Sequence, residues 1–385
     1  ERYQQCPFKF YAQYGLKLEP RRVRSFGAPE IGTFLHANLE RLGNYLLDNN
    51  KQWRDLNEED QQNLCRSVAD EILQENQGGE ETSDAYQKAI EQRVQRTLHV
   101  TVDRLVEWSK RSDFDTKYLE QDFGRQGGWD PIRVPLGEER YLRLIGQIDR
   151  IDEYTRDGQT YGMVIDYKSG GAHVTAQDVY YGLKLQLMTY LLALESAYGK
   201  TRGESITPAA VVYSYVKNPK IPADVPISYE DAVSLAKESD AWKNSGYFSD
   251  DVELLTHIDN KFLSYGLKQG PYVPIATTKD QTISRNDLRK VKNPGEFDVM
   301  CRYTNHVMAD IGRHIGDGQF PIQPYQLNKN RPCTYCDYNT VCRFDSSRNK
   351  YNYLSGLSED DALERMKEVL NEGNNSNEGG ENHGC

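Results

Sequence analysis

Three cysteines are clustered near the end of the sequence, at Cys333, Cys336 and Cys342, and a fourth, Cys6, precedes them by more than 320 residues. Clustered cysteines in a chain without a secretory signal are usually metal ligands rather than disulfide partners. Three thiolates need a fourth ligand, and Cys6 is the best candidate because its surroundings are also aromatic and contain proline. Zinc and a [4Fe–4S] cluster both accept four thiolates. Either group would join the two ends of the chain and stabilise the fold by roughly 5 kcal/mol.

The rest of the composition describes a polar chain. Its 385 residues include 47 basic and 58 acidic side chains, and no apolar run approaches the roughly 20 residues of a membrane helix. The net charge of −11 excludes a surface that is basic everywhere but allows a local basic groove. An odd number of cysteines, seven, fits the reducing cytoplasm. Because the sequence begins at Glu1 and is patterned at once, we expect a piece of a longer protein.

The periodicity of the apolar residues changes along the chain. Helices are predicted over 31–47, 57–76, 83–111 and 176–198. Strands are predicted over 118–123, 140–154, 160–168 and 209–216. Asp157-Gly158 predicts a tight turn between the second and third strands. This order predicts an α/β core inside large helical insertions. Cys65 and Cys301 fall in helical patterns and are predicted to be packed thiols.

The strand 160–168 ends in an acid and a base. Asp166 and Lys168 are two residues apart, so they share one face of the strand, immediately before the turn Ser169-Gly170. A surface ion pair would also explain this arrangement.

A second acid, Asp149, lies in the preceding strand pattern. If 140–154 is one strand, Asp149 shares a face with Tyr141, Ile145 and Ile151. Pairing of Asp149 with Arg150 is the simple structural alternative. Two carboxylates and one ammonium on adjacent strands are, however, suited to hold Mg²⁺ and to act on a phosphodiester. The lysine would orient the attacking water or stabilise the transition state.

Four further residues are candidates for the same site. His36 lies on helix 31–47 away from the leucine stripe, although a lone helical histidine is usually solvated. Glu120 is an acid in a strand pattern, where a structural role is equally compatible. Gln186 and Tyr190 are four residues apart and so share a helix face, but such a tyrosine is often part of a core.

These motifs, in this order, resemble the RecB-like branch of the PD-(D/E)xK nucleases. The matching stretches are Gly32-Thr-Phe-Leu-His36, Gly146-Gln-Ile-Asp149, Asp166-Tyr-Lys168 and Gln186-Leu-Met-Thr-Tyr190. The resemblance implies a mixed central sheet and a Mg²⁺ ion held by His36, Asp149, Asp166 and the backbone carbonyl of Tyr167. It also implies that Lys168 acts on the attacking water and that Gln186 and Tyr190 complete the site. Glu120 matches the first acidic position of the family loosely, and Ile148 replaces the proline of the family name.

The two ends of the chain resemble the AddB (RexB) family of bacterial helicase–nuclease subunits. The matching segments are Tyr3–Leu18, with YQQCPFKF, and Pro332–Asp345, with PCTYC. This resemblance implies a [4Fe–4S] cluster on Cys6, Cys333, Cys336 and Cys342 that staples the fold. It also implies an AddA-like helicase–nuclease partner, single-stranded DNA from an unwound duplex end as substrate, and cleavage of the 5′-ended strand.

The predicted organisation is a nuclease domain over 1–345 followed by a C-terminal helix and a tail over 346–385, in which the Gly, Asn and Glu content of residues 371–385 predicts disorder. Within the nuclease domain, the predicted parts are cluster-binding ends at 1–18 and 325–345, a helical region at 29–111 and a catalytic core at 117–217. The hypothesis is a cytoplasmic, Mg²⁺-dependent DNA exonuclease or endonuclease. The alternatives are a catalytically silent nuclease fold that binds DNA or supports a partner, and a stand-alone iron–sulfur nuclease.

Overall fold

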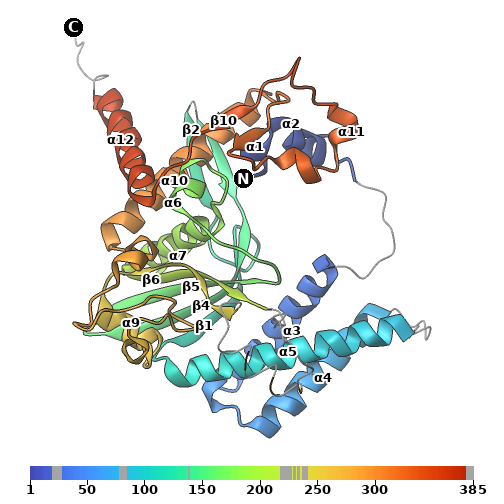
Figure 1. Cartoon of the computed structure of the whole chain (residues 1–385), viewed down its shortest axis with the longest axis vertical. Helices are drawn as coiled ribbons and strands as arrows, with labels where there is room; N and C mark the ends of the chain where they lie inside the picture. The colour runs from blue at the N-terminus through green and yellow to red at the C-terminus, as the bar shows by residue number, and fades with distance from the viewer. Residues whose placement is uncertain are drawn as a thin grey trace.

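The structure is a computed structural model. It describes residues 1–19, 28–77, 85–137, 139–216 and 242–378, and the single residues 228, 231 and 235. Figure 1 shows a central sheet between two groups of helices, with the N-terminal segments beside α11 at the upper right. Among the described residues, no helix combines the length and the apolar character needed to cross a membrane.

The central sheet has six strands in the order β1-β4-β5-β6-β7-β8. Their bounds are β1 (Asp115–Phe123), β4 (Gly146–Arg156), β5 (Gln159–Lys168), β6 (Ile206–Tyr215), β7 (Ser245–Ser249) and β8 (Val291–Lys292). β1, β4 and β5 are antiparallel, whereas β5 and β6 run parallel, so the predicted α/β fold with a mixed sheet is confirmed. The sheet continues beyond residue 217, because β7 and β8 extend it past the segment predicted as the catalytic core.

The predicted tight turn joins β4 to β5. The two strands pair up to Arg156 and Gln159, which leaves only Asp157 and Gly158 in the turn. Both have positive φ, +53° and +80°, as the twist of a two-residue hairpin requires. The hairpin therefore fixes the register of the strands that carry Asp149 and Asp166.

One face of the sheet is covered by helices from the first third of the chain. These are α3 (Ala28–Asp48), α4 (Glu58–Gln77) and α5 (Ala85–Arg111), with α9 (Val252–Ile258) beside them. The first three agree with the predicted helices; residues 83 and 84 lie outside the described residues. Ile165 and Tyr167 of β5 point into this layer, as does Leu35 of α3.

The other face is covered by helices from the second half of the chain. These are α6 (Ala176–Tyr180), α7 (Gln186–Arg202), α10 (Pro294–Gly316) and α12 (Glu359–Glu378). Val164 of β5 points into this layer, so the alternation of a strand assigns Asp166 and Lys168 to the same side. Cys301 is buried in α10 and Cys65 in α4, which confirms both as packed thiols.

Two predicted elements are wrong because each is divided. The strand predicted over 140–154 is interrupted at Ile145: β3 (Arg140–Leu144) pairs with β2 (Ile132–Gly137) in a separate hairpin, and β4 joins the main sheet. Tyr141 and Ile145 are therefore exposed and do not share the environment of Asp149. The helix predicted over 176–198 is interrupted between α6 and α7, where Gly182 takes the left-handed φ of +67° that ends helices.

The N-terminal segment packs against the segment that contains the three clustered cysteines. α1 (Arg2–Gln5) and α2 (Pro7–Phe10) lie beside α11 (Asn339–Cys342). The Phe8 amide donates to the Pro321 carbonyl at 3.2 Å, and the Tyr338 hydroxyl donates to the Leu18 carbonyl at 3.0 Å. Composition predicts disorder from Asn371 onward, but α12 continues to Glu378; residues 379–385 lie outside the described residues.

Candidate metal centre

Helix α3 and strands β1 and β4 bring three potential ligands together. His36, Glu120 and Asp149 offer ligand atoms that all lie within 4.8 Å of one another. His36 Nδ1 is 3.4 Å from Asp149 Oδ2 and 3.8 Å from Glu120 Oε1. Ligands of an octahedral Mg²⁺ at about 2.1 Å would be roughly 3.0 Å apart when adjacent and 4.2 Å apart when opposite. The donor set and its spacing therefore fit a hard divalent cation.

The local backbone explains why Asp149 and Glu120 point into this site. β4 and β5 separate after the Arg150–Ile165 pair, and the Asp149 carboxylate accepts the amide of Tyr167 at 2.7 Å. Glu120 lies between two registered pairs of β1 and β4 and has a positive φ of +45°. Such a conformation is unfavourable for a side chain other than glycine or asparagine, and it clusters at functional sites.

His36 reaches the site across the end of β5. Its Nε2 is 3.0 Å from the carbonyl oxygen of Tyr167. That distance fits a hydrogen bond that leaves Nδ1 free as a ligand, and it also fits two adjacent ligands of one ion. The second arrangement is the one in which the Tyr167 carbonyl is a metal ligand, as predicted.

Asp166, Lys168, Gln186 and Tyr190 form a hydrogen-bonded chain beside the three ligands. The Lys168 ammonium is paired with the Asp166 carboxylate, and it donates to Gln186 Oε1 at 3.1 Å. Gln186 Nε2 in turn lies 2.8 Å from both Asp166 Oδ1 and the Tyr190 hydroxyl. The predicted catalytic residues thus lie in two neighbouring groups, and the Asp166 carboxylate, although close enough to Asp149 and His36 to feel their charges, is not among the ligand atoms that lie within 4.8 Å of one another.

The alternative in which Asp149 pairs with Arg150 does not hold. The Arg150 guanidinium donates to both oxygens of Asp152, at 2.7 and 2.6 Å, and its centre lies 5.7 Å from the Trp108 ring. Both charged side chains are buried. Asp149 consequently has no arginine partner of its own among the described residues and remains directed toward His36.

Two residues of the site were missed by the sequence analysis. Tyr213 lies opposite Asp166 in the parallel β5–β6 ladder, and the Lys168 ammonium is 5.4 Å from the centre of its ring. Alternation along the predicted strand 209–216 could have identified it. The Glu1 carboxylate accepts the amides of Leu185 and Gln186 at 2.7 and 3.1 Å and so caps the start of α7. No local signal in the sequence connects residues so far apart.

Burial makes Asp149 and Asp166 weaker acids than usual in the absence of a cation. Burial, together with the neighbouring Asp149 charge, raises the pKa of Asp166 to about 7. Burial likewise raises the pKa of Asp149 to about 6, with a contribution from Glu120. For His36, burial is outweighed by the bond to Glu120 and the acidic neighbours, and its pKa is raised.

These shifts predict a pH-dependent effect of Mg²⁺ on stability. Carboxyl groups with raised folded pKa values destabilise the metal-free fold increasingly as pH rises from about 4 to 7, and loss of the His36 proton acts in the same direction. Bound Mg²⁺ offsets this effect and competes with protons. Thermal unfolding with Mg²⁺ or EDTA should therefore show a larger increase in Tm at about pH 8 than at about pH 5.5. Equal increases at both values would contradict the assignment.

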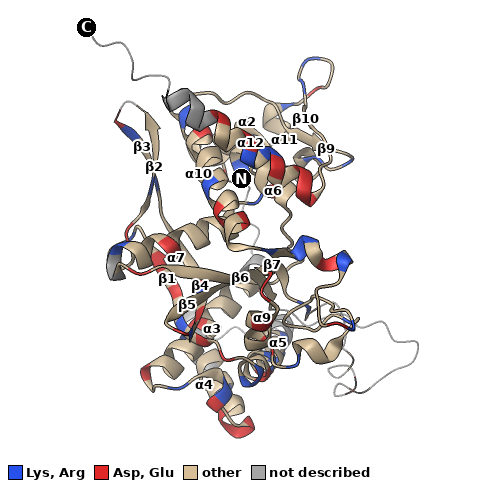
Figure 2. Cartoon of the chain, turned by 90° about the vertical axis from the view of Figure 1, so that its left-hand side faces the viewer, with Lys and Arg blue, Asp and Glu red and all other residues tan. Residues whose placement is uncertain are grey.

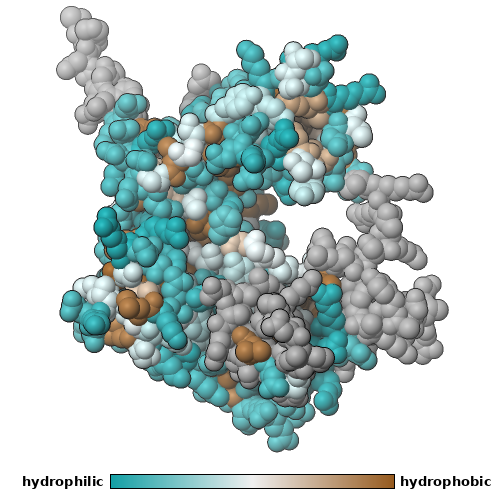
Figure 3. Space-filling view, viewed as in Figure 1, coloured by the Kyte–Doolittle hydropathy of each residue, from teal (hydrophilic) through white to brown (hydrophobic). Residues whose placement is uncertain are grey.

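Cys6 and the three clustered cysteines together line a cavity of about 120 Å³, with Phe8 and Phe344. It is formed between the two ends of the chain, where brown and tan hydrophobic residues gather at the upper right of Figure 3. Burial raises the pKa of the Cys6 thiol, and burial and the neighbouring thiols raise that of Cys333. No three of these sulfur atoms lie within 4.8 Å of one another, as judged over the described residues.

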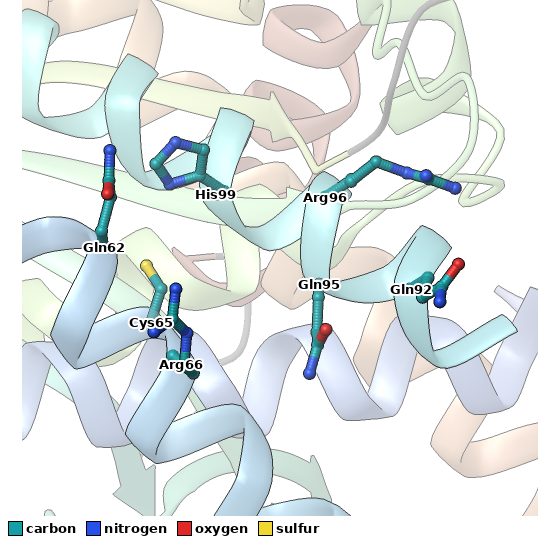
Figure 4. A pocket seen from close by; sticks show the side chains of 7 residues that line it. All are labelled: Gln62, Cys65, Arg66, Gln92, Gln95, Arg96 and His99. Atoms are coloured by element: carbon teal, nitrogen blue, oxygen red, sulfur yellow. The ribbon is translucent and has the colours of Figure 1, made fainter. Parts of the chain in front are cut away.

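A further hollow, of about 390 Å³, lies between α4 and α5 and contains none of the predicted catalytic residues (Figure 4). It is lined by Gln62, Cys65, Arg66, Gln92, Gln95, Arg96 and His99. Burial raises the pKa of Cys65 to about 12, so its thiol stays protonated and is a poor nucleophile.

The family model of the PD-(D/E)XK nuclease superfamily matches residues 1–343. The chain therefore belongs to this superfamily, and the resemblance stated from its motifs is confirmed. Nucleases of this kind use a divalent metal such as Mg²⁺, for which the site has suitable ligands.

Similar proteins are named as the B component of an ATP-dependent helicase/deoxyribonuclease. The chain is 31% identical over 372 residues to that of Ruminiclostridium cellulolyticum, 31% over 375 residues to that of Clostridioides difficile, and 26% over 374 residues to that of Clostridium tetani. These matches cover 96–97% of this chain but 32% of each relative. The chain thus spans about a third of the length of the relatives it matches.

Proposed function

We propose that this chain is a deoxyribonuclease domain that hydrolyses phosphodiester bonds in single-stranded DNA with Mg²⁺. The observation that carries this proposal is the convergence of His36, Glu120 and Asp149, with Asp166 and Lys168 beside them. The names of the relatives support DNA as substrate and a helicase-containing assembly as context. In that assembly an AddA-like partner provides the second nuclease and the motor, in the cytoplasm, and this domain cuts the 5′-ended strand.

The ligands proposed for Mg²⁺ are His36, Asp149, Asp166 and the Tyr167 carbonyl. Glu120 is a further acid at the same site, at 3.8 Å from His36 Nδ1. The bound ion supplies Lewis-acid polarisation of the phosphate and lowers the pKa of a coordinated water. The protein contributes a fixed orientation of Asp149, which accepts the Tyr167 amide, and of His36, which lies 3.0 Å from the Tyr167 carbonyl.

The remaining polar residues act on the water and the phosphate. The Lys168 ammonium is positioned by Asp166 and Gln186 and is half-buried, so its positive charge is available to a phosphate oxygen or the attacking water. Tyr190 keeps its proton, because burial and the nearby Asp166 charge raise its pKa. Its hydroxyl accepts a bond from Gln186 and retains a hydrogen for donation.

We propose further that Cys6, Cys333, Cys336 and Cys342 hold a [4Fe–4S] cluster. The four side chains line one cavity, and four thiolates are the ligand set that such a cluster needs. The cluster would act as a covalent tie between the two ends of the chain.

The proposed function is tested by titrating Mg²⁺ against cleavage of single strands labelled at the 5′ or the 3′ end. We expect no cleavage in EDTA, saturable cleavage with Mg²⁺, and the same loss of activity for both labels when Asp149→Asn is used. The label whose products shorten first gives the polarity. Cleavage that persists in EDTA, or none at any Mg²⁺ concentration, would contradict the proposal.

A further inference from the structure

The β2–β3 hairpin extends from the body of the molecule as an arm beside α10 (Figure 2). Its two faces differ in character. The inner face packs on α10, where Leu136 lies so close to Gly312 that an added Cβ would be 2.8 Å from its side chain. The outer face is exposed and carries Arg133, Tyr141 and Arg143. The arm is thus held by one face while the other is available to a partner.

Two arginines are directly opposite each other on the outer face. Arg133 pairs with Arg143 across the two strands. Like charges at opposed positions of an antiparallel pair destabilise it. Neither guanidinium has a carboxylate partner among the described residues. An anionic partner that binds between them would relieve this repulsion.

Tyr141 adds an aromatic surface to the two charges. Its side chain is 52% exposed, and the Arg133 guanidinium lies 5.1 Å from the centre of its ring. Stacking of bases on aromatic and arginine side chains, combined with phosphate contacts, is how proteins bind single-stranded nucleic acids. The acidic groups at the other end of the arm, Glu139 in the turn and Asp317 beside Arg140, confine the unpaired positive charge to its base.

The base of the arm adjoins the proposed catalytic site. Exposed Ile145 joins β3 to β4, and Asp149 follows four residues later, roughly 13 Å along an extended chain. Arg143 also donates to the carbonyl of Gly124, the residue after β1. The adjacent Phe123 ring contacts that of Tyr190, with 6.4 Å between their centres. A strand on the outer face would therefore continue toward the metal ligands.

We propose that Arg133, Tyr141 and Arg143 form a binding surface for the DNA strand on its path to or from the catalytic site. This inference rests on the proposed function and adds the residues that bind the substrate outside the reacting centre. The arginines contact phosphates and Tyr141 stacks on a base. A protein partner would not require two opposed, unpaired arginines next to an exposed ring, so nucleic acid is the occupant that the charges favour.

The test measures binding of a fluorescent single strand by anisotropy, in EDTA, over a series of salt concentrations. Arg133→Glu with Arg143→Glu should weaken binding at least tenfold and lower the steepness of log Kd against log salt by about 1.4, since each phosphate contact on a single strand contributes about 0.7. Tyr141→Ala should weaken binding roughly tenfold with little change in that slope. Arg133→Glu alone, which leaves the bond from Arg143 to the Gly124 carbonyl intact, should lower the slope by about 0.7.

Matched controls separate this surface from general charge and from catalysis. Arg348→Glu with Arg365→Glu makes the same change in net charge at exposed positions elsewhere and should bind like the wild type. Asp166→Ala should bind normally although it does not cleave. Wild-type affinity and slope in both hairpin arginine variants, or equal losses in the control pair, would overturn the proposal. If the hairpin variants weaken DNA binding but the wild-type protein does not cleave DNA at any Mg²⁺ concentration, the binding surface is supported and the proposed function is contradicted.

Discussion

Asp166→Ala is expected to lower the rate of Mg²⁺-dependent cleavage of single-stranded DNA by about a thousandfold or more. The substitution removes a proposed metal ligand and also the carboxylate that pairs with Lys168 and accepts the Gln186 amide. Without that carboxylate, the Lys168 ammonium and the Gln186 side-chain amide lose the acceptor that they share. The measurement is single-turnover cleavage of an end-labelled strand at saturating Mg²⁺.

The fold should survive this substitution, because the Asp166 carboxylate is buried in a setting that raises its pKa to about 7. Removing such a group relieves a buried charge, so the Tm in EDTA should be unchanged or higher. Asp298→Ala, which removes an exposed acid on α10 paired with Arg302, is the matched control and should cleave normally. Cleavage by Asp166→Ala at the wild-type rate would exclude the proposed site.

The purified protein is expected to be brown, and Cys6→Ser is expected to remove this colour and to lower the free energy of unfolding by about 5 kcal/mol. The colour is the absorption of the proposed [4Fe–4S] cluster, and the loss of stability follows from opening a loop of more than 320 residues. The measurements are the visible spectrum, iron and sulfide content, and denaturant unfolding without oxygen.

The control for this variant is Cys65→Ala, which truncates a buried thiol in α4 far from the cavity of the four cysteines. It should keep the colour and lose only the modest stability of a small core truncation, about 1 kcal/mol. A colourless wild-type protein with one zinc per chain would contradict the [4Fe–4S] assignment, but the four cysteines would still link the two parts of the chain through the zinc ion.

The grouping of residues in the candidate site could be predicted in part because strand alternation and helix periodicity are local. Asp166 and Lys168 share a face because they are two residues apart, and Gln186 and Tyr190 because they are four apart. The Asp157-Gly158 turn then fixes which strands are adjacent. These rules do not predict how close separate helices and strands lie. The 3.4 Å distance between His36 Nδ1 and Asp149 Oδ2 could therefore be expected only from the resemblance to the nuclease family.

The divided elements show where local pattern is insufficient. Residues 176–198 have one apolar stripe, yet Gly182 ends α6 and the Glu1 carboxylate starts α7 from the opposite end of the chain. Residues 140–154 have uniform strand composition, yet β3 and β4 belong to different sheets. There Gly146 lies against the Phe123 ring, which would be 2.6 Å from an added Cβ. In both cases a tertiary contact decides the boundary.

Asp149 and Arg150 are adjacent in β4 and point to opposite faces of the sheet. A shift of this strand by one residue is therefore strongly unfavourable. Asp149 is directed to His36, while Arg150 is enclosed with Asp152 beneath Trp108. A slip of β4 by one position would present the guanidinium to the cation and leave a lone carboxylate against the indole, and an unpaired buried charge costs several kcal/mol. Molecules with a shifted β4 should therefore be rare, and nearly every folded molecule should have Asp149 directed toward His36.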